Sequence, residues 1–140
     1  NVECNIKFMC RFFKLFLILL ILNSCSIERD WHSIESVIIN TNYLLNLEEY
    51  NFNQLKSDSS TIELDHTKFR DVMLNSEAGK GRHIYKGASY NAIILFSDST
   101  ELKLKLSAIY GICQEIDYKR HYTLRNDNNL NSNRWIEMKK

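Results

Sequence analysis

Cys113 is the thiol that a nucleophilic mechanism would use, and His121 and His83 are the candidate general bases beside it. A cysteine and histidine pair of this kind would suit a cell-wall or peptide hydrolase. A reactive thiolate, however, needs a helix N-terminus or a neighbouring cation, whereas residues 109–114 resemble a half-buried strand. We therefore expect Cys113 to be a packing residue, and we keep the hydrolase as an alternative hypothesis.

The other reactive residue types form no recognised motif. No two histidines have the close spacing of metal ligands on one helix face, and zinc needs three or four converging ligands. The segment Gly79-Lys-Gly-Arg82 lacks the P-loop spacing between its glycines. The chain also has no Gly-x-Ser-x-Gly elbow. We predict no metal site and no cofactor, and a domain that binds rather than catalyses.

Charge is distributed unevenly along the chain. Residues 25–79 contain 4 Lys and Arg against 10 Asp and Glu, whereas residues 80–140 contain 11 against 6. This gradient suggests a surface in the second half that attracts an anionic cell-wall polymer, lipid head groups or an acidic envelope protein. Its candidate residues are Lys86, Lys103, Lys105, Lys119, Arg120 and Arg125. The alternative is that these are solvated strand faces and edge lysines that discourage aggregation.

The composition of the whole chain limits the class of protein. Its 140 residues include 18 Lys and Arg, 17 Asp and Glu, and no proline. This length argues against a multidomain enzyme, and the near-neutral balance argues against a polybasic nucleic-acid binder. An aromatic content of 11% is too high for a disordered chain. We expect one ordinary globular domain that does not bind nucleic acid.

The densest apolar run lies near the N-terminus and is typical of a signal peptide. Met9 is the expected start, and residues 1–8 are then an upstream extension or a fragment end. Arg11 and Lys14 precede an unbroken apolar stretch from Leu15 to Leu22. A membrane-spanning helix needs about 20 apolar residues, so this stretch fits the hydrophobic region of a signal peptide.

The next four residues, Leu22-Asn23-Ser24-Cys25, resemble the lipobox of bacterial lipoproteins. The resemblance covers Met9 to Cys25 and implies cleavage before Cys25 and attachment of diacylglycerol to its thiol. Amino-terminal acylation, with palmitate for example, often follows, and two or three acyl chains anchor a protein stably. The implied location is the bacterial cell envelope, in the outer membrane if the cell has one, with the lipid bilayer as the partner of Cys25.

This processing would leave three parts. Residues 1–24 would be the extension and signal peptide, residues 25–32 the lipidated cysteine and a short tether, and residues 33–140 a single domain. Cys113 would then be the one free thiol, so no disulfide within the domain is available and stability must come from the hydrophobic core.

The apolar spacing predicts the elements that position these residues. Ser33 and the spacing from Ile34 to Leu45 predict a helix over roughly residues 33–50. Residues 61–65 alternate like a short strand, and a second short helix follows around Phe69, capped by Asp65 or Thr67 and ended near Asn75 or Gly79.

From residue 82 onward the apolar period changes to two. Residues 82–86, 91–96, 101–107, 109–116 and 118–124 are predicted strands, with residues 97–100 as the loop of an antiparallel hairpin. The segment from Asn126 is expected to be a loop followed by a short helix or a final strand. The predicted fold is α+β, an N-terminal helix packed on a mainly antiparallel sheet of about four to six strands.

We therefore expect a membrane-anchored envelope lipoprotein with a small non-catalytic binding or interaction domain. The alternatives are the hydrolase that uses Cys113 with His121 or His83, and a structural subunit of an envelope complex.

Overall fold

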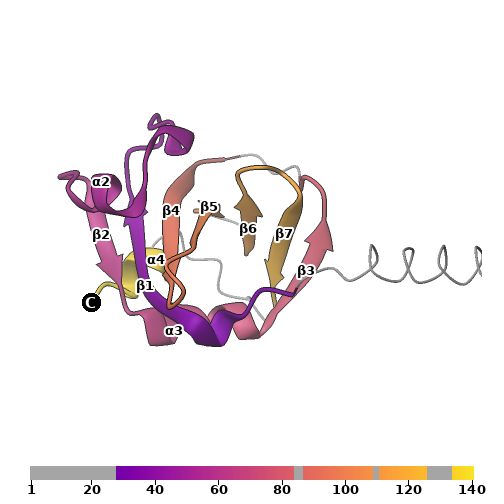
Figure 1. Cartoon of the computed structure of the whole chain (residues 1–140). Helices are drawn as coiled ribbons and strands as arrows, with labels where there is room; N and C mark the ends of the chain where they lie inside the picture. Colours follow the sequence, from indigo (N-terminus) through magenta and orange to yellow (C-terminus); the bar gives the residue numbers. More distant parts are fainter. Residues whose placement is uncertain (1–27, 84–86, 109–110, 126–133) are drawn as a thin grey trace, which may run out of the picture.

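A single sheet organises the protein in a computed structural model that describes residues 28–83, 87–108, 111–125 and 134–140. Seven strands pair in the order β2-β1-β4-β5-β6-β7-β3, and every neighbouring pair is antiparallel. The sheet curls, and helix α3 (His66–Leu74) lies across one end of it (Figure 1). The α+β class is confirmed, with more strands than the four to six expected.

The predicted helix over residues 33–50 is wrong. A short 3-10 turn, η1 (Trp31–Ser33), leads into strand β1 (Ile34–Asn40), which lies between β2 (Thr61–Leu64) and β4 (Ser89–Phe96). The β-branched run Val37-Ile38-Ile39 favours a strand, and all three side chains are fully buried because both faces of the sheet are covered here. Because both faces of β1 are covered, its sequence lacks the alternation of apolar and polar residues that would have indicated a strand.

The segment between β1 and β2 covers the outer face of the sheet. It contains a second 3-10 turn, η2 (Leu47–Glu49), and helix α2 (Phe52–Lys56), which begins with a capping box between Asn51 and Gln54. Leu47, Phe52 and Leu55 pack there on Ile38 and Ile93 as a small second core.

The hairpin predicted around residues 97–100 is confirmed. Strand β4 pairs with β5 (Glu101–Ser107) in antiparallel register, and β5 has the bounds expected from sequence. Leu102, Leu104 and Leu106 point into the main core, whereas Lys103 and Lys105 are half-buried on the opposite face. A strand with one apolar face is the case in which period-two alternation is most informative.

Helix α3 carries the chain from one edge of the sheet to the other. Asp65 caps its N-terminus by accepting from the backbone N–H groups of Thr67 and Lys68, and Phe69 and Met73 enter the main core. Asn75 ends the helix, as expected, and strand β3 (Ser76–Lys80) follows at once and pairs with β7 (Arg120–Leu124).

Gly79 therefore does not end the helix but lies within β3. The imidazole of His121 on the facing strand lies over Gly79, and a Cβ at this position would force that ring to move. The strand expected at residues 82–86 is wrong at Arg82 and His83, which are irregular, and residues 84–86 lie outside the described part of the chain.

The C-terminal residues close the other edge of the sheet. Strand β6 (Ile112–Glu115) lies between β5 and β7. The short helix α4 (Arg134–Glu137) places Trp135 in the main core, where its Nε1 donates to the Ser107 carbonyl at 2.9 Å. Lys139 then bridges to Leu64 on the edge strand β2. Of the two forms expected for this segment, the structure has the short helix, followed by a single isolated bridge.

Candidate ligand cavity

A cavity of about 1030 Å³ runs along strand β3. Four of the five β3 residues line it, together with residues 28–32, the end of α3 and the start of β7. Its volume is at the upper end of the range of small-ligand sites. Successive side chains of a strand point to opposite faces of the sheet. Tyr122 and Leu124 of β7 point into the main core, so the residues paired with them, Ala78 and Ser76, share this inner face. The pair of Lys80 and Arg120 lies on the same face.

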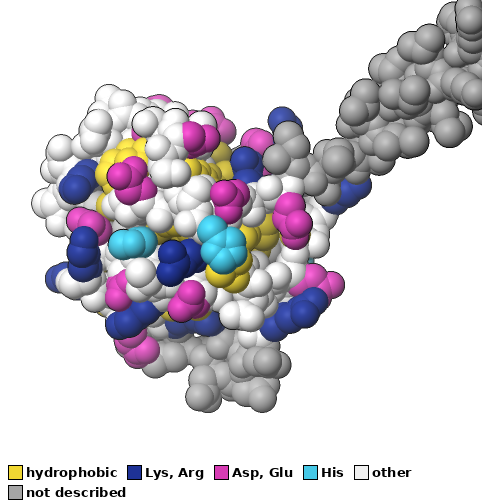
Figure 2. All heavy atoms as spheres, turned by 60° about the horizontal axis from the view of Figure 1, so that its bottom comes forward, with side chains coloured by type: hydrophobic (Ala, Val, Ile, Leu, Met, Phe, Trp, Pro, Cys, Tyr) yellow, Lys and Arg dark blue, Asp and Glu magenta, His cyan; other side chains and the backbone are white. Residues whose placement is uncertain are grey.

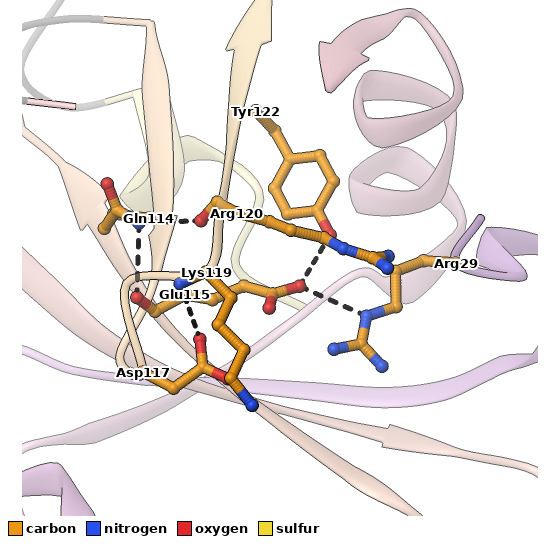
Figure 3. A network of polar contacts seen from close by, with 7 residues as sticks. All are labelled: Arg29, Gln114, Glu115, Asp117, Lys119, Arg120 and Tyr122. Atoms are coloured by element: carbon orange, nitrogen blue, oxygen red, sulfur yellow. Dashed lines mark hydrogen bonds and ion pairs between the residues drawn. The ribbon is translucent and has the colours of Figure 1, made fainter. Parts of the chain in front are cut away.

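A buried carboxylate network lies beneath the cavity. Glu115 of β6 accepts at Oε1 from the Tyr122 hydroxyl at 2.7 Å and from the Arg29 Nε at 3.1 Å (Figure 3). The Glu115 side chain is 3% exposed, whereas that of Arg29 is 37% exposed. This network ties the segment at residues 28–32 to β6 and β7, and Trp31 adds an edge-to-face contact with the Tyr122 ring at 5.1 Å.

Burial and this carboxylate together raise the pKa of Tyr122, so the phenol stays protonated and donates to Glu115. Burial acts to lower the pKa of Arg29, but its hydrogen bond and charge interaction with Glu115 outweigh this and raise it. The network is therefore structural, because the neutral phenol of Tyr122 and the guanidinium of Arg29 both donate to the Glu115 carboxylate.

Charged side chains of both signs line the cavity, including the cations Lys80, Lys119 and Arg120 and the carboxylates Glu28 and Asp30. Lys80 and Arg120 are directly opposite each other in the β3–β7 ladder and both line the cavity. Like charges in this arrangement destabilise a sheet. Lys119, which also lines the cavity, is paired with Asp117 at 3.8 Å. Within the part of the chain that the structure describes, no ion pair includes Lys80.

The far end of the cavity is apolar. Met73 and Leu74 from the end of α3 line it together with Trp31, and Leu74 is 42% exposed. Between this end and Lys80, β3 contributes only the small residues Ser76, Ala78 and Gly79. The cavity therefore combines apolar side chains from the end of α3 with charged side chains of both signs.

Comparison with protein-family models, with curated proteins and with solved structures finds no significant match to this chain.

The basic residues singled out from the sequence do not form one surface. Lys119 and Arg120 line the cavity, Lys103 and Lys105 lie on β5 outside it, and Arg125 follows β7 and pairs with Glu77 at 3.5 Å. Lys86 lies outside the described residues. The face over α3 shows basic and acidic side chains interspersed (Figure 2). The structure thus unites two of the six candidates with Lys80, which was not among them.

The residues of the alternative hydrolase lie on opposite faces of the sheet. The Cys113 side chain is fully buried in the main core, opposite Leu106 and Tyr122, and burial raises its pKa to about 12. His121 faces the other side with His83, their ring centroids 5.1 Å apart. A buried neutral thiol on the face away from both imidazoles gives no support to nucleophilic catalysis.

The burial of Cys113 predicts slow alkylation and alkaline sensitivity. At pH 8 iodoacetamide should modify Cys113 in urea but not in the native protein, as measured by mass spectrometry of the peptide that contains it. Because the folded protein raises the thiol pKa, stability is complete below about pH 9 and falls as the pH rises towards about 12. The decline should be shallower in Cys113→Ala, and rapid native alkylation would contradict the assignment.

Three further sequence expectations concern the signal segment, membrane-spanning helices and metal sites. The signal segment and Cys25 lie outside the described residues. Within the described ranges, every helix is too short or too polar to cross a membrane. Across the same ranges, no three His, Cys, Asp or Glu side chains are grouped so that they could hold a metal ion.

Sequence reasoning missed Arg29, Glu115 and Lys80. Arg29 and Glu115 are 86 positions apart, and no spacing rule connects them. A signal did exist in Gln114 and Glu115, two polar residues between Cys113 and Ile116 in a predicted strand, because polar residues inside an apolar strand usually mark a buried network.

Proposed function

We propose that this protein is a membrane-anchored lipoprotein of the bacterial cell envelope, and that its small domain binds a ligand in the cavity along β3 without catalysis. The observation that carries the binding role is the cavity of about 1030 Å³ and the side chains that line it. Charged side chains of both signs line this cavity, the cations including Lys80 and Lys119 and the carboxylates Glu28 and Asp30, and such a lining suits a polar or charged ligand.

The support for binding rather than catalysis is the state of the titratable groups. Tyr122 has a raised pKa, so its phenol keeps its proton near neutral pH, and it donates that proton to Glu115 rather than towards the cavity. Cys113 lies in the core. The cavity therefore offers charged and apolar side chains to a ligand, which are properties of a binding site.

The anchor follows from the lipobox resemblance at Leu22 to Cys25 and has a direct test. Cells that express the full chain would be fed labelled palmitate, with Cys25→Ala as the control. We expect label and membrane association in the unmodified sequence and loss of both in the variant. An unlabelled, soluble wild-type protein would overturn the localisation.

The binding role can be tested in the native envelope. A photo-crosslinking amino acid would be placed at Ala78, which lines the cavity, or at Leu44, which is 95% exposed and lies outside it. We expect an adduct at position 78 that is lost when Lys80→Glu is added. Equal adducts at both positions, or none at position 78, would contradict a cavity-bound ligand.

A further inference from the structure

We infer that His83 and His121 form a binding site for a divalent late transition-metal ion, such as Zn²⁺ or Cu²⁺, held by the two imidazoles and completed by water or by a donor atom from a partner. His121 lies on the face of β7 opposite to Tyr122, which points into the main core. The inference is therefore independent of the proposed ligand cavity and of the membrane anchor.

The first support is the distance between the two rings. The centroids of the His83 and His121 rings are 5.1 Å apart, and the ring planes are inclined at 69°. A zinc ion lies about 2.0 Å from a ligating ring nitrogen, and so about 3.2 Å from the centroid of that ring. Two rings that share one tetrahedral ion then have centroids about 5.2 Å apart. The fold therefore already holds these two rings at the separation of a pair that binds one ion.

The second support is that each ring has a nitrogen available for a metal. Nδ1 of His121 lies 3.1 Å from the Gly81 carbonyl oxygen, which can only accept, so Nδ1 donates and Nε2 of the neutral ring has the free lone pair. A hydrogen bond of this kind to a backbone carbonyl orients most metal-binding histidines. Nδ1 of His83 is buried and has no hydrogen-bond partner among the described residues. Buried polar atoms rarely lack a partner, and a bound ion would supply one.

The third support is the buried amide that fixes the two histidines relative to each other. Gln114 is 2% exposed, its Oε1 accepts from the backbone N–H of His83 at 2.7 Å, and its Nε2 donates to the Arg120 carbonyl at 2.7 Å. The same side chain therefore joins the segment of His83 to the residue before His121. Gly79 lies under the His121 ring and has no Cβ to displace it. The two rings are thus positioned before any ion binds.

The donor set determines the class of ion. Imidazole nitrogen is a good ligand for Zn²⁺, Cu²⁺ and Ni²⁺, whereas Mg²⁺ and Ca²⁺ prefer oxygen ligands. Structural zinc sites use four protein ligands, and across the described residues no third His, Cys, Asp or Glu completes a group of metal ligands. The site is therefore open, and its remaining coordination positions are available to water or to a donor from a partner.

The test measures Zn²⁺ binding to the full-length protein by isothermal titration calorimetry. The protein is purified without a histidine tag, its accessible thiols are alkylated, and Mg²⁺ serves as the negative probe. We expect one Zn²⁺ to bind per chain and Mg²⁺ not to bind. Because the ion binds the folded state, Zn²⁺ should also raise the melting temperature. Hydrogen exchange followed by mass spectrometry should show new protection of residues 81–83.

The decisive variant is His121→Asn, whose side-chain amide can still donate to the Gly81 carbonyl but has no imidazole nitrogen for the metal. It should weaken Zn²⁺ binding at least about tenfold, the usual loss when even an outer partner of a metal ligand is removed. His66→Ala is the matched control, because His66 is equally half-buried but lies on α3, and it should bind Zn²⁺ as the wild type does.

Two further variants separate metal binding from folding. His83→Ala lies in the irregular segment after β3 and keeps its backbone bond to Gln114, so it should lose Zn²⁺ binding while the metal-free protein melts at the wild-type temperature. Gly79→Ala retains both imidazoles but forces the His121 ring to move, and should also weaken binding. Equal Zn²⁺ binding by the wild type, His121→Asn and His83→Ala would place the ion elsewhere and overturn the site. A wild-type protein that binds neither Zn²⁺ nor Cu²⁺ would overturn it as well.

Discussion

Replacing Glu115 with alanine is expected to lower the free energy of unfolding by about 2–3 kcal/mol, measured by urea denaturation. The Glu115 side chain is 3% exposed and accepts from both Tyr122 and Arg29, so its removal leaves a buried hydroxyl and a partly buried guanidinium without their acceptor. We place the value at the low end for a broken buried pair because Arg29 is 37% exposed and water can partly replace the carboxylate.

Two variants show whether burial and charge are the cause. Glu115→Gln keeps an acceptor for Tyr122 but loses the charge facing Arg29, and should cost about half as much as Glu115→Ala. Glu77→Ala removes a comparable carboxylate from the exposed pair with Arg125 and should change stability by less than about 0.5 kcal/mol. Equal effects of Glu115→Ala and Glu77→Ala would mean that the network beneath the cavity is not a buried support.

Replacing Trp135 with alanine is expected to destabilise the protein by about 3–5 kcal/mol, the usual cost of removing a large aromatic side chain from a core. Trp135 is 2% exposed, its ring centroid is 5.7 Å from that of Phe69, and its Nε1 donates to the Ser107 carbonyl. The same ring therefore joins the C-terminal segment to helix α3 and strand β5. Thermal and urea unfolding would both report the loss.

The controls for this prediction are Trp135→Phe and Leu44→Ala. Trp135→Phe keeps much of the contact with Phe69 and should lose distinctly less stability than the alanine variant. Leu44 is 95% exposed, so Leu44→Ala should leave the unfolding midpoint unchanged. If Trp135→Ala unfolds at the wild-type urea concentration, the C-terminal helix is not part of the core.

The contrast between β5 and β1 shows when a local apolar pattern is enough to predict a strand. Leu102, Leu104 and Leu106 alternate with two lysines because one face of β5 contacts the core and the other is half-exposed, so the period of two is visible in the sequence. In β1 the outer face is covered by η2 and α2, and Ile38 is as buried as Val37 and Ile39. Its apolar run then fits a helix as well as a strand.

The residues of the candidate site were harder to predict from local sequence patterns than the strands were. Lys119 and Arg120 were recognisable as basic residues, but their relation to Lys80 depends on pairing between β3 and β7, about 40 positions apart. Arg29 and Glu115 are even farther apart, 86 positions, and meet only in the folded domain. Non-local pairs of this kind leave no spacing in the sequence, because any register between the strands would satisfy local preference equally well.

Local patterns in the sequence were enough to predict the α+β class, the β4–β5 hairpin and the resemblance of Leu22 to Cys25 to a lipobox, and they narrowed the cap of α3 to Asp65 or Thr67. Long-range packing was needed to make β1 an inner strand, to place Cys113 and His121 on opposite faces, and to form a cavity between β3, β7 and residues 28–32. These features depend on which faces become covered and which strands become neighbours, and both are set by packing across the whole domain.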